Sequence, residues 1–277
     1  MAPETLAGVG IGPTGALSLR LSVASLVRVL FANPRDGTAM LALERKATLV
    51  ETAQEPMVEV KAQPFGGAVR IVDMQALQAL IGAFHFDSER SRSEGDFRLF
   101  IQPSSWPALR ELCLERLGCE YDPVLESDPG RELTEEFFDA LGIKLLPGQY
   151  ESEPTGLVVE GQPQPTGNPR ARGYPTARVY RVFEAWITDP PLAQVLLDNS
   201  EGVSDQALCE RALRDAGSGG KGRANAAFAL PLGSITSFYV GLSPNERNQP
   251  VNFEGHQLDE TVAAVLAGIR VPKYQRL

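Results

Sequence analysis

The chain has 277 residues and a net charge of −9, with 43% hydrophobic and 22% charged residues. This composition is typical of a soluble globular protein, and the length allows one large domain or two small ones. The negative charge argues against nucleic acid as a partner, although bound cations can still make a local site attractive to phosphates.

The sequence has no segment typical of a membrane span or a secretory signal. No apolar run approaches the roughly 20 residues that cross a bilayer, and no basic segment followed by an apolar one opens the chain. The cysteines, Cys113, Cys119 and Cys209, show neither metal-binding spacing nor a disulfide framework. We therefore expect a cytoplasmic protein that does not bind membranes.

The first part of the chain predicts a flexible tail followed by a β-hairpin. Residues 1–17 are small, Gly-rich and Pro-containing, as in many loose termini. Residues 18–32 are rich in Val and Leu and predict a strand. A turn that ends in Asp36-Gly37 leads to a return strand at residues 38–45. A further short strand is predicted at residues 57–61, before the pair Gly66-Gly67.

Residues 70–125 have predicted elements of their own. In order, these are a helix capped by Asp73, a polar loop at 86–96, a strand at 97–101 and a helix that ends at Gly118. As a functional element, this segment would be a lid that sets substrate size. The alternatives are a contact surface, for example in a homodimer, or a decoration without function.

Residues 128–143 are the stretch that suggests chemistry as well as packing. Asp128 is placed to cap a helix, Pro129 suits its first position, and Gly142 closes it. An apolar stripe at four-residue spacing follows one face of this helix: Leu133, Phe137 and Leu141.

A second face of the same helix carries three glutamates. Glu132, Glu135 and Glu136 stand at positions i, i+3 and i+4, which are neighbours on a helix surface. Three like charges repel unless water or a cation screens them, and clustered carboxylates suit Mg²⁺ or Mn²⁺. The alternative is a solvated acidic face, which is common on helices.

The segment Arg131-Glu-Leu-Thr-Glu-Glu136 resembles the core of the signature of the Nudix hydrolase superfamily. The resemblance implies an α/β/α sandwich in which the glutamates hold divalent metal that activates water against a diphosphate. Glu132, Glu135 and Glu136 would be ligands or base, and Arg131 would orient a glutamate. Gly66 and Gly67 match the glycines that open the signature, where the backbone approaches a phosphate or the metal.

The sequence departs from this family pattern in three places. The spacing from Gly67 to Arg131 is about fifty residues longer than in the family, so residues 70–125 look like an insertion within the signature. Asp73 stands where the signature has a glutamate, and Phe138 stands where it has a glycine.

The remainder of the chain predicts further strands and helices around one polar loop. The strands are expected at 156–160, 177–187 and 226–231, and the helices at 204–216, from 234, and at 260–268. The loop at 161–176 carries Arg170 and Arg172. Because Arg binds phosphate bidentately, both are candidate substrate ligands, and the alternative is two solvated loop charges.

These patterns predict a single domain over residues 18–277 with an α/β (α+β) fold, in which a mixed sheet lies between helices. The predicted function is Mg²⁺- or Mn²⁺-dependent hydrolysis of a small-molecule diphosphate, a nucleoside diphosphate linked to another group. The alternative is a binding or assembly protein that keeps the fold without turnover. The split signature motivates this alternative, because a fold does not determine an activity.

Overall fold

The structure is a computed structural model that describes residues 17–50, 55–119, 121–159, 162–166, 169–247 and 249–266. The predicted tail at 1–17 therefore lies outside the described residues except for its last residue. The same holds for Glu160, in the strand predicted at 156–160, and for the last residues of the helix predicted at 260–268.

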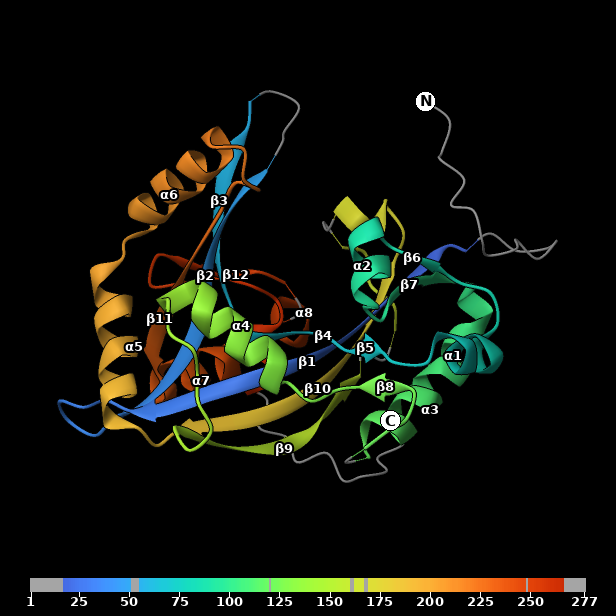
Figure 1. Cartoon of the computed structure of the whole chain (residues 1–277), viewed down its shortest axis with the longest axis horizontal. Helices are drawn as coiled ribbons and strands as arrows, with labels where there is room; N and C mark the ends of the chain where they lie inside the picture. The colour runs from blue at the N-terminus through green and yellow to red at the C-terminus, as the bar shows by residue number, and fades with distance from the viewer. Residues whose placement is uncertain are drawn as a thin grey trace.

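Within these residues, eleven strands form one mixed sheet (Figure 1). Its main path runs β12 (Val251–Phe253), β13 (His256–Leu258), β3 (Met57–Gln63), β2 (Ala39–Val50), β1 (Leu19–Ala32), β10 (Thr176–Ile187) and β9 (Tyr150–Val159). Off this path, β11 (Arg223–Pro231) pairs with β2, β4 (Phe65–Ala68) and β7 (Arg98–Ile101) pair with β1, and β6 (His85–Phe86) pairs with β7. A separate two-stranded sheet joins β5 (Arg70–Ile71) to β8 (Leu125–Glu126).

Strand β1 lies at the centre of the fold. It pairs in parallel with β10 and antiparallel with β2, β4 and β7 along different parts of its length. Its side chains are buried on both faces, which explains its nearly continuous apolar sequence. Helices must therefore cover both sides of the sheet.

Two groups of helices provide this cover. On the face that bears Val27 and Val29 lie α4 (Gly130–Leu141) and α5 (Pro190–Gly202), and further along the same strand lie α1 (Met74–Ile81) and α3 (Trp106–Leu117). On the opposite face lie α7 (Leu232–Gly241) and α9 (Val262–Leu266). The predicted α/β fold with a mixed sheet between helices is confirmed.

Residues 70–125 share a core with the central strand. Side chains of α1 and α3 pack with Leu19, Leu21 and Val23 of β1, and β7 pairs with the same part of that strand. The segment also contributes α2 (Glu89–Glu94), which lies across a gap from α6 (Asp205–Gly217) in Figure 1.

The predicted polar loop at 86–96 is wrong, because this stretch contains β6 and α2. Ser88 caps α2 by accepting a hydrogen bond from the Ser91 N–H. The buried Asp87 carboxylate accepts a hydrogen bond of 2.6 Å from the Arg20 side chain on β1. A polar sequence is therefore ordered here by a buried ion pair with a distant strand.

Several predicted ends are also displaced. Strand β2 continues to Val50, beyond the predicted end at residue 45, because β3 and β11 pair with it there. Helix α5 occupies residues for which the sequence analysis placed no element. None of the helices in the described ranges has the length and apolar character needed to cross a bilayer.

Candidate functional site

Helix α4 begins one residue later than predicted. Asp128 Oδ1 accepts a hydrogen bond of 2.8 Å from the Gly130 N–H, and Pro129 stands just before the first helical residue. Gly142 ends the helix in the left-handed conformation, with a φ of 69°. Gly142 therefore ends α4 as predicted, whereas the N-cap residue is Pro129 and not Asp128, whose carboxylate bonds the Gly130 N–H in the turn before the helix.

The predicted apolar stripe fixes the orientation of α4. Leu133 and Phe137 are 1% and 0% exposed, and Ala140 packs with them in the same core cluster. The Phe137 ring lies against the Phe65 ring of β4, with 4.9 Å between the ring centroids. Because this stripe is packed in the core, the face of α4 that carries the glutamates lies toward β4.

The glycines of β4 bring that strand into contact with the glutamates. The Gly66 N–H donates a hydrogen bond to Glu136 Oε2. A Cβ atom on Gly67 would lie 2.2 Å from Glu132 Oε2, so the carboxylate occupies the place of a side chain there. A Cβ atom on Gly66 would lie 2.1 Å from the Ser25 carbonyl oxygen. Gly66 therefore needs glycine, because backbone atoms and a φ of 126° oppose a side chain, whereas at Gly67 only the movable Glu132 carboxylate stands in the way.

The three predicted glutamates have different surroundings. Glu132 forms an ion pair of 2.6 Å with Arg131, and its side chain is 22% exposed. Glu135 lies 3.4 Å from the same guanidinium, with a side chain that is 61% exposed. Glu136 is the most enclosed of them and is held by Gly66. Arg131 thus contacts both Glu132 and Glu135.

Burial perturbs two of these carboxyl groups. Burial raises the pKa of Glu132, and the nearby Arg131 partly offsets this effect. Burial, followed by the charge of Glu44, raises the pKa of Glu136 well above its ordinary value, against the opposing effects of the Gly66 N–H and Lys46. Without a nearby cation, Glu136 is therefore poorly stabilised as an anion, and its protonated form is favoured.

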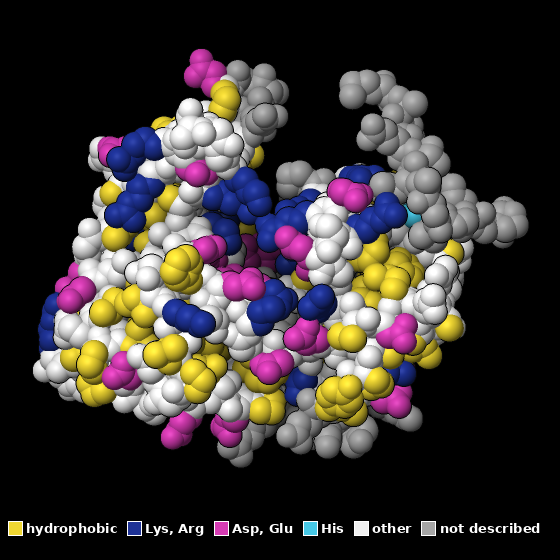
Figure 2. Space-filling model, in the orientation of Figure 1, with side chains coloured by type: hydrophobic (Ala, Val, Ile, Leu, Met, Phe, Trp, Pro, Cys, Tyr) yellow, Lys and Arg dark blue, Asp and Glu magenta, His cyan; other side chains and the backbone are white. Residues whose placement is uncertain are grey.

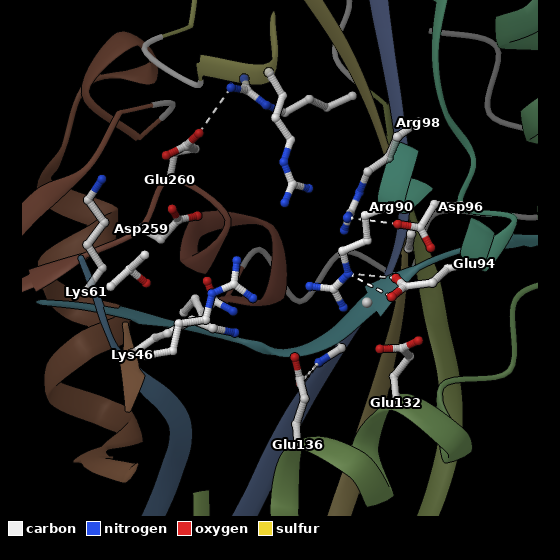
Figure 3. A pocket seen from close by; sticks show the side chains of 18 of the residues that line it. Lys46, Lys61, Arg90, Glu94, Asp96, Arg98, Glu132, Glu136, Asp259 and Glu260 are labelled. Carbon is white, nitrogen blue, oxygen red and sulfur yellow. Dashed lines mark hydrogen bonds and ion pairs between the residues drawn. The ribbon is translucent and has the colours of Figure 1, made fainter. Parts of the chain in front are cut away.

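The acidic face of α4 lines a cleft of about 1390 Å³. Figure 2 shows this hollow between the side of α6 and the side of α2, with Lys and Arg side chains along its rim. In Figure 3, Glu132 and Glu136 point from α4 into the cleft, and Lys46 and Lys61 enter it from β2 and β3. Ligand pockets commonly measure roughly 300–1,000 Å³, so a nucleotide-sized molecule fits here.

Positive side chains from several elements line this cleft. They include Lys46, Lys61, Arg90, Arg98, Arg170 and Arg223. Burial lowers the pKa of the Arg170 guanidinium, and the charges of Arg98, Arg90 and Arg223 lower it further, against the opposing effect of Asp87. Arg90 and Arg98 pair with carboxylates of the cleft, and guanidinium groups in this position can also bind phosphate groups.

The two arginines of the predicted loop have different positions. Arg170 lies in η2 (Pro169–Ala171) and lines the cleft. Arg172 is absent from the described lining, and its guanidinium lies over the Phe100 ring, 5.6 Å from the centroid. The structure therefore brings Arg170, but not Arg172, to the glutamates.

Residues 70–125 form one wall of the cleft and leave it open. Arg90 and Glu94 of α2 enter it, paired at 2.8 Å, and Asp96 and Arg98 lie beside them, paired at 3.1 Å. Asp73 caps α1 by accepting a hydrogen bond from the Ala76 N–H, and it is not part of the described lining. The segment thus supplies charge to the site, which the sequence analysis did not predict.

The donor atoms in the cleft suit a divalent cation, but the acidic side chains are dispersed. Within the described ranges, no three His, Cys, Asp or Glu side chains come together as a metal centre. One buried carboxylate oxygen near Glu136, Glu44 Oε1, has no hydrogen-bond partner, and a cation would satisfy it. Two carboxylates are enough for Mg²⁺, which completes its shell with water and phosphate oxygens.

Gly67→Ala tests the contact between β4 and Glu132. The new Cβ atom would displace only the end of a flexible side chain, so we expect the free energy of unfolding to change by less than about 1 kcal/mol. Titration with Mn²⁺ should show weaker binding than wild type, because the Glu132 carboxylate moves. Equal Mn²⁺ affinity would remove Glu132 from the cation site.

Comparisons with known proteins give one structural similarity. No family model matches the sequence, and no curated protein matches it. The structure is similar to the crystal structure of a mutT/nudix family protein from Listeria innocua, over 78% of this chain and 82% of that chain, with 12% identity and a TM-score of 0.33. A similarity of this size assigns neither a family nor an activity.

Proposed function

We propose that the protein is a hydrolase that uses Mg²⁺ or Mn²⁺ to cleave the diphosphate of a nucleoside diphosphate linked to another group. One observation carries the proposal: the acidic face of α4 and a wall of Lys and Arg side chains line the same open cleft. The first suits a hard cation, and the second suits phosphate oxygens. The likeness of Arg131–Glu136 to the Nudix signature supports the same activity.

Glu132 and Glu136 are the residues on α4 that would hold the cation, since both point into the cleft and the Glu135 side chain is 61% exposed. When bound, the cation offsets charge on the phosphate oxygens and lowers the pKa of water.

In the proposed reaction, water adds to one phosphorus atom, the bond to the bridging oxygen breaks, and each product keeps one phosphate. A carboxylate of the acidic face accepts the proton of the water.

The opposite wall positions the substrate. The charges of Arg98 and Arg223 act on Arg170, and each of these arginines can donate two hydrogen bonds to a phosphate group. Lys46 and Lys61 stand nearer to the strands and act as point charges. The substrate chain of phosphates would therefore extend from α4 toward η2.

A panel of nucleoside diphosphate derivatives tests this function. With Mg²⁺ or Mn²⁺, we expect wild-type protein to hydrolyse at least one member and to release phosphate-bearing products in equal amounts, with no turnover in EDTA. Arg170→Ala should raise KM, because it removes phosphate contacts. Arg172→Ala is the matched control from the same loop, and it should leave KM unchanged.

A binding protein without turnover is the second candidate. The dispersed acidic side chains and the pairing of Arg131 with two glutamates favour it. Such a protein would bind members of the same panel, with affinity that falls in Arg170→Ala, and would cleave none of them. Calorimetry and product analysis on one set of samples separate the two functions.

A further inference from the structure

Glu44 is a buried acidic residue on a strand that the predicted signature does not include. Its side chain is 0% exposed. On β2 it lies on the same face as Met40 and Ala42, which pack toward α4. Its neighbours in the sheet are Gln63 of β3 and Ala227 of β11. A carboxylate enclosed between two paired strands needs strong compensation.

This compensation is incomplete. Glu44 Oε2 accepts hydrogen bonds from Lys46 Nζ at 3.2 Å and from Gln63 Nε2 at 2.9 Å. Glu44 Oε1 is buried and has no hydrogen-bond partner. On the neighbouring strand β11, Asn225 Oδ1 is buried and unpartnered as well. Asn225 lies opposite Lys46 in the sheet register, so two unsatisfied oxygens stand on adjacent strands.

Both oxygens belong to residues that face the glutamates of α4. Glu44 and Asn225 line a side pocket of about 560 Å³ together with Glu132 and Glu136, and this pocket shares Lys46 with the main cleft. The charge of Glu44 acts directly on Glu136. Two enclosed carboxylates are thus close together, with Lys46 as the cation that contacts one of them. The unpartnered oxygen of Glu44 therefore lies at the edge of a pocket that also contains Glu136, and it lacks a donor or a cation.

We propose that Glu44 is a ligand of the divalent cation, together with Glu136, so that the ion binds between β2 and α4. Asn225 Oδ1 is placed to complete this oxygen set. The proposal rests on the proposed function, because it places the cation which that function uses. It adds a ligand from a strand to the glutamates of α4. It also gives the unsatisfied oxygen of Glu44 a partner.

Binding of Mn²⁺ alone, without substrate, tests the assignment. Glu44→Gln should weaken Mn²⁺ binding at least about tenfold by calorimetry, since even residues that only orient ligands cost about 10–100-fold. Glu59→Gln is the matched control: Glu59 lies on β3, lines the main cleft outside the side pocket and pairs with Lys61 at 2.8 Å, as Glu44 pairs with Lys46 two residues later. The control should bind Mn²⁺ as wild type does.

Three other outcomes would each overturn the role of Glu44, and one of them would also overturn the proposed function. Equal Mn²⁺ affinity in Glu44→Gln and wild type would overturn the role of Glu44 and leave the proposed function standing. A wild type that binds no Mn²⁺ would overturn both. A lower apo Tm in Glu44→Gln with unchanged Mn²⁺ affinity would show that Glu44 only pairs with Lys46.

A measurement on wild-type protein covers the case in which Glu44→Gln does not fold. Fe²⁺ bound in place of Mn²⁺, with ascorbate and peroxide, cleaves the backbone near the ion. We expect cuts in β2 near Glu44 and in β11 near Asn225, as well as in α4. Cuts confined to α4 would overturn the proposal.

Discussion

Phe137→Ala should lower the free energy of unfolding by about 3–5 kcal/mol, the usual cost of emptying a buried aromatic site. The Phe137 side chain is 0% exposed and lies between α4 and the sheet, against the ring of Phe65. Its removal leaves a cavity next to β4, whose glycines contact the glutamates. A urea titration of the metal-free protein measures the change directly.

The adjacent residue provides the control for this experiment. Phe138 is 57% exposed, so Phe138→Ala removes the same group from the other side of the helix and should change stability by less than about 0.5 kcal/mol. If both variants cost the same, α4 is rotated relative to the structure, and the acidic face is not where the cleft requires it.

Glu136→Gln should remove most metal-dependent turnover, by about a hundredfold or more, and still leave a stable protein. The amide keeps an oxygen that can accept the hydrogen bond from the Gly66 N–H, but it cannot bind the cation as an anion. Glu135→Gln should have a much smaller effect, since that side chain is 61% exposed and lies beside Arg131. Steady-state kinetics on the best substrate of the panel compares the two.

The stability of the metal-free variant depends on pH in a defined direction. Because the pKa of Glu136 in the folded state lies well above its ordinary value of 4.5, the folded protein retains a proton that the unfolded chain releases. The resulting stabilisation is complete below about pH 4.5 and is lost as the pH rises through the raised pKa. Glu136→Gln should therefore match wild type near pH 4 and equal or exceed it at neutral pH.

The opposite result would change the assignment. A Glu136→Gln protein with a lower apo Tm at neutral pH, together with a wild type that hydrolyses no member of the panel, would identify a structural carboxylate. The binding function would then replace the hydrolase.

Local signals were sufficient to predict helix α4. Asp128, Gly142 and the spacing of Leu133 and Phe137 are all read within one segment, and the structure agrees with them to within a residue at the start of the helix. Local patterns also predicted β1, β10 and α6, but they missed α2 and α5. Such signals are reliable because capping and apolar spacing act over a few residues.

The cationic side of the cleft could not be predicted in this way. Lys46 enters it because β2 continues past the predicted end, where two other strands pair with it. Arg90 enters it because a polar segment becomes α2 next to the buried pair of Asp87 and Arg20. These positions depend on contacts between distant parts of the chain. For Glu44 the local signal was weak, because Arg45 and Lys46 follow it in the same strand and its burial depends on distant contacts.

The parallel pairing of β1 with β10 has a consequence for how the chain folds during synthesis. The ion pair between Arg28 and Glu184, which joins these strands, spans 156 residues. On the ribosome, β1 and β2 therefore emerge long before β10. Until β10 is synthesised, the apolar edge of β1 has no strand to pair with. Long-range pairing of this kind folds slowly, and an uncovered edge invites association with other chains. A chain that stops short of β10 would lack the strand that closes the middle of the sheet, and it would tend to aggregate.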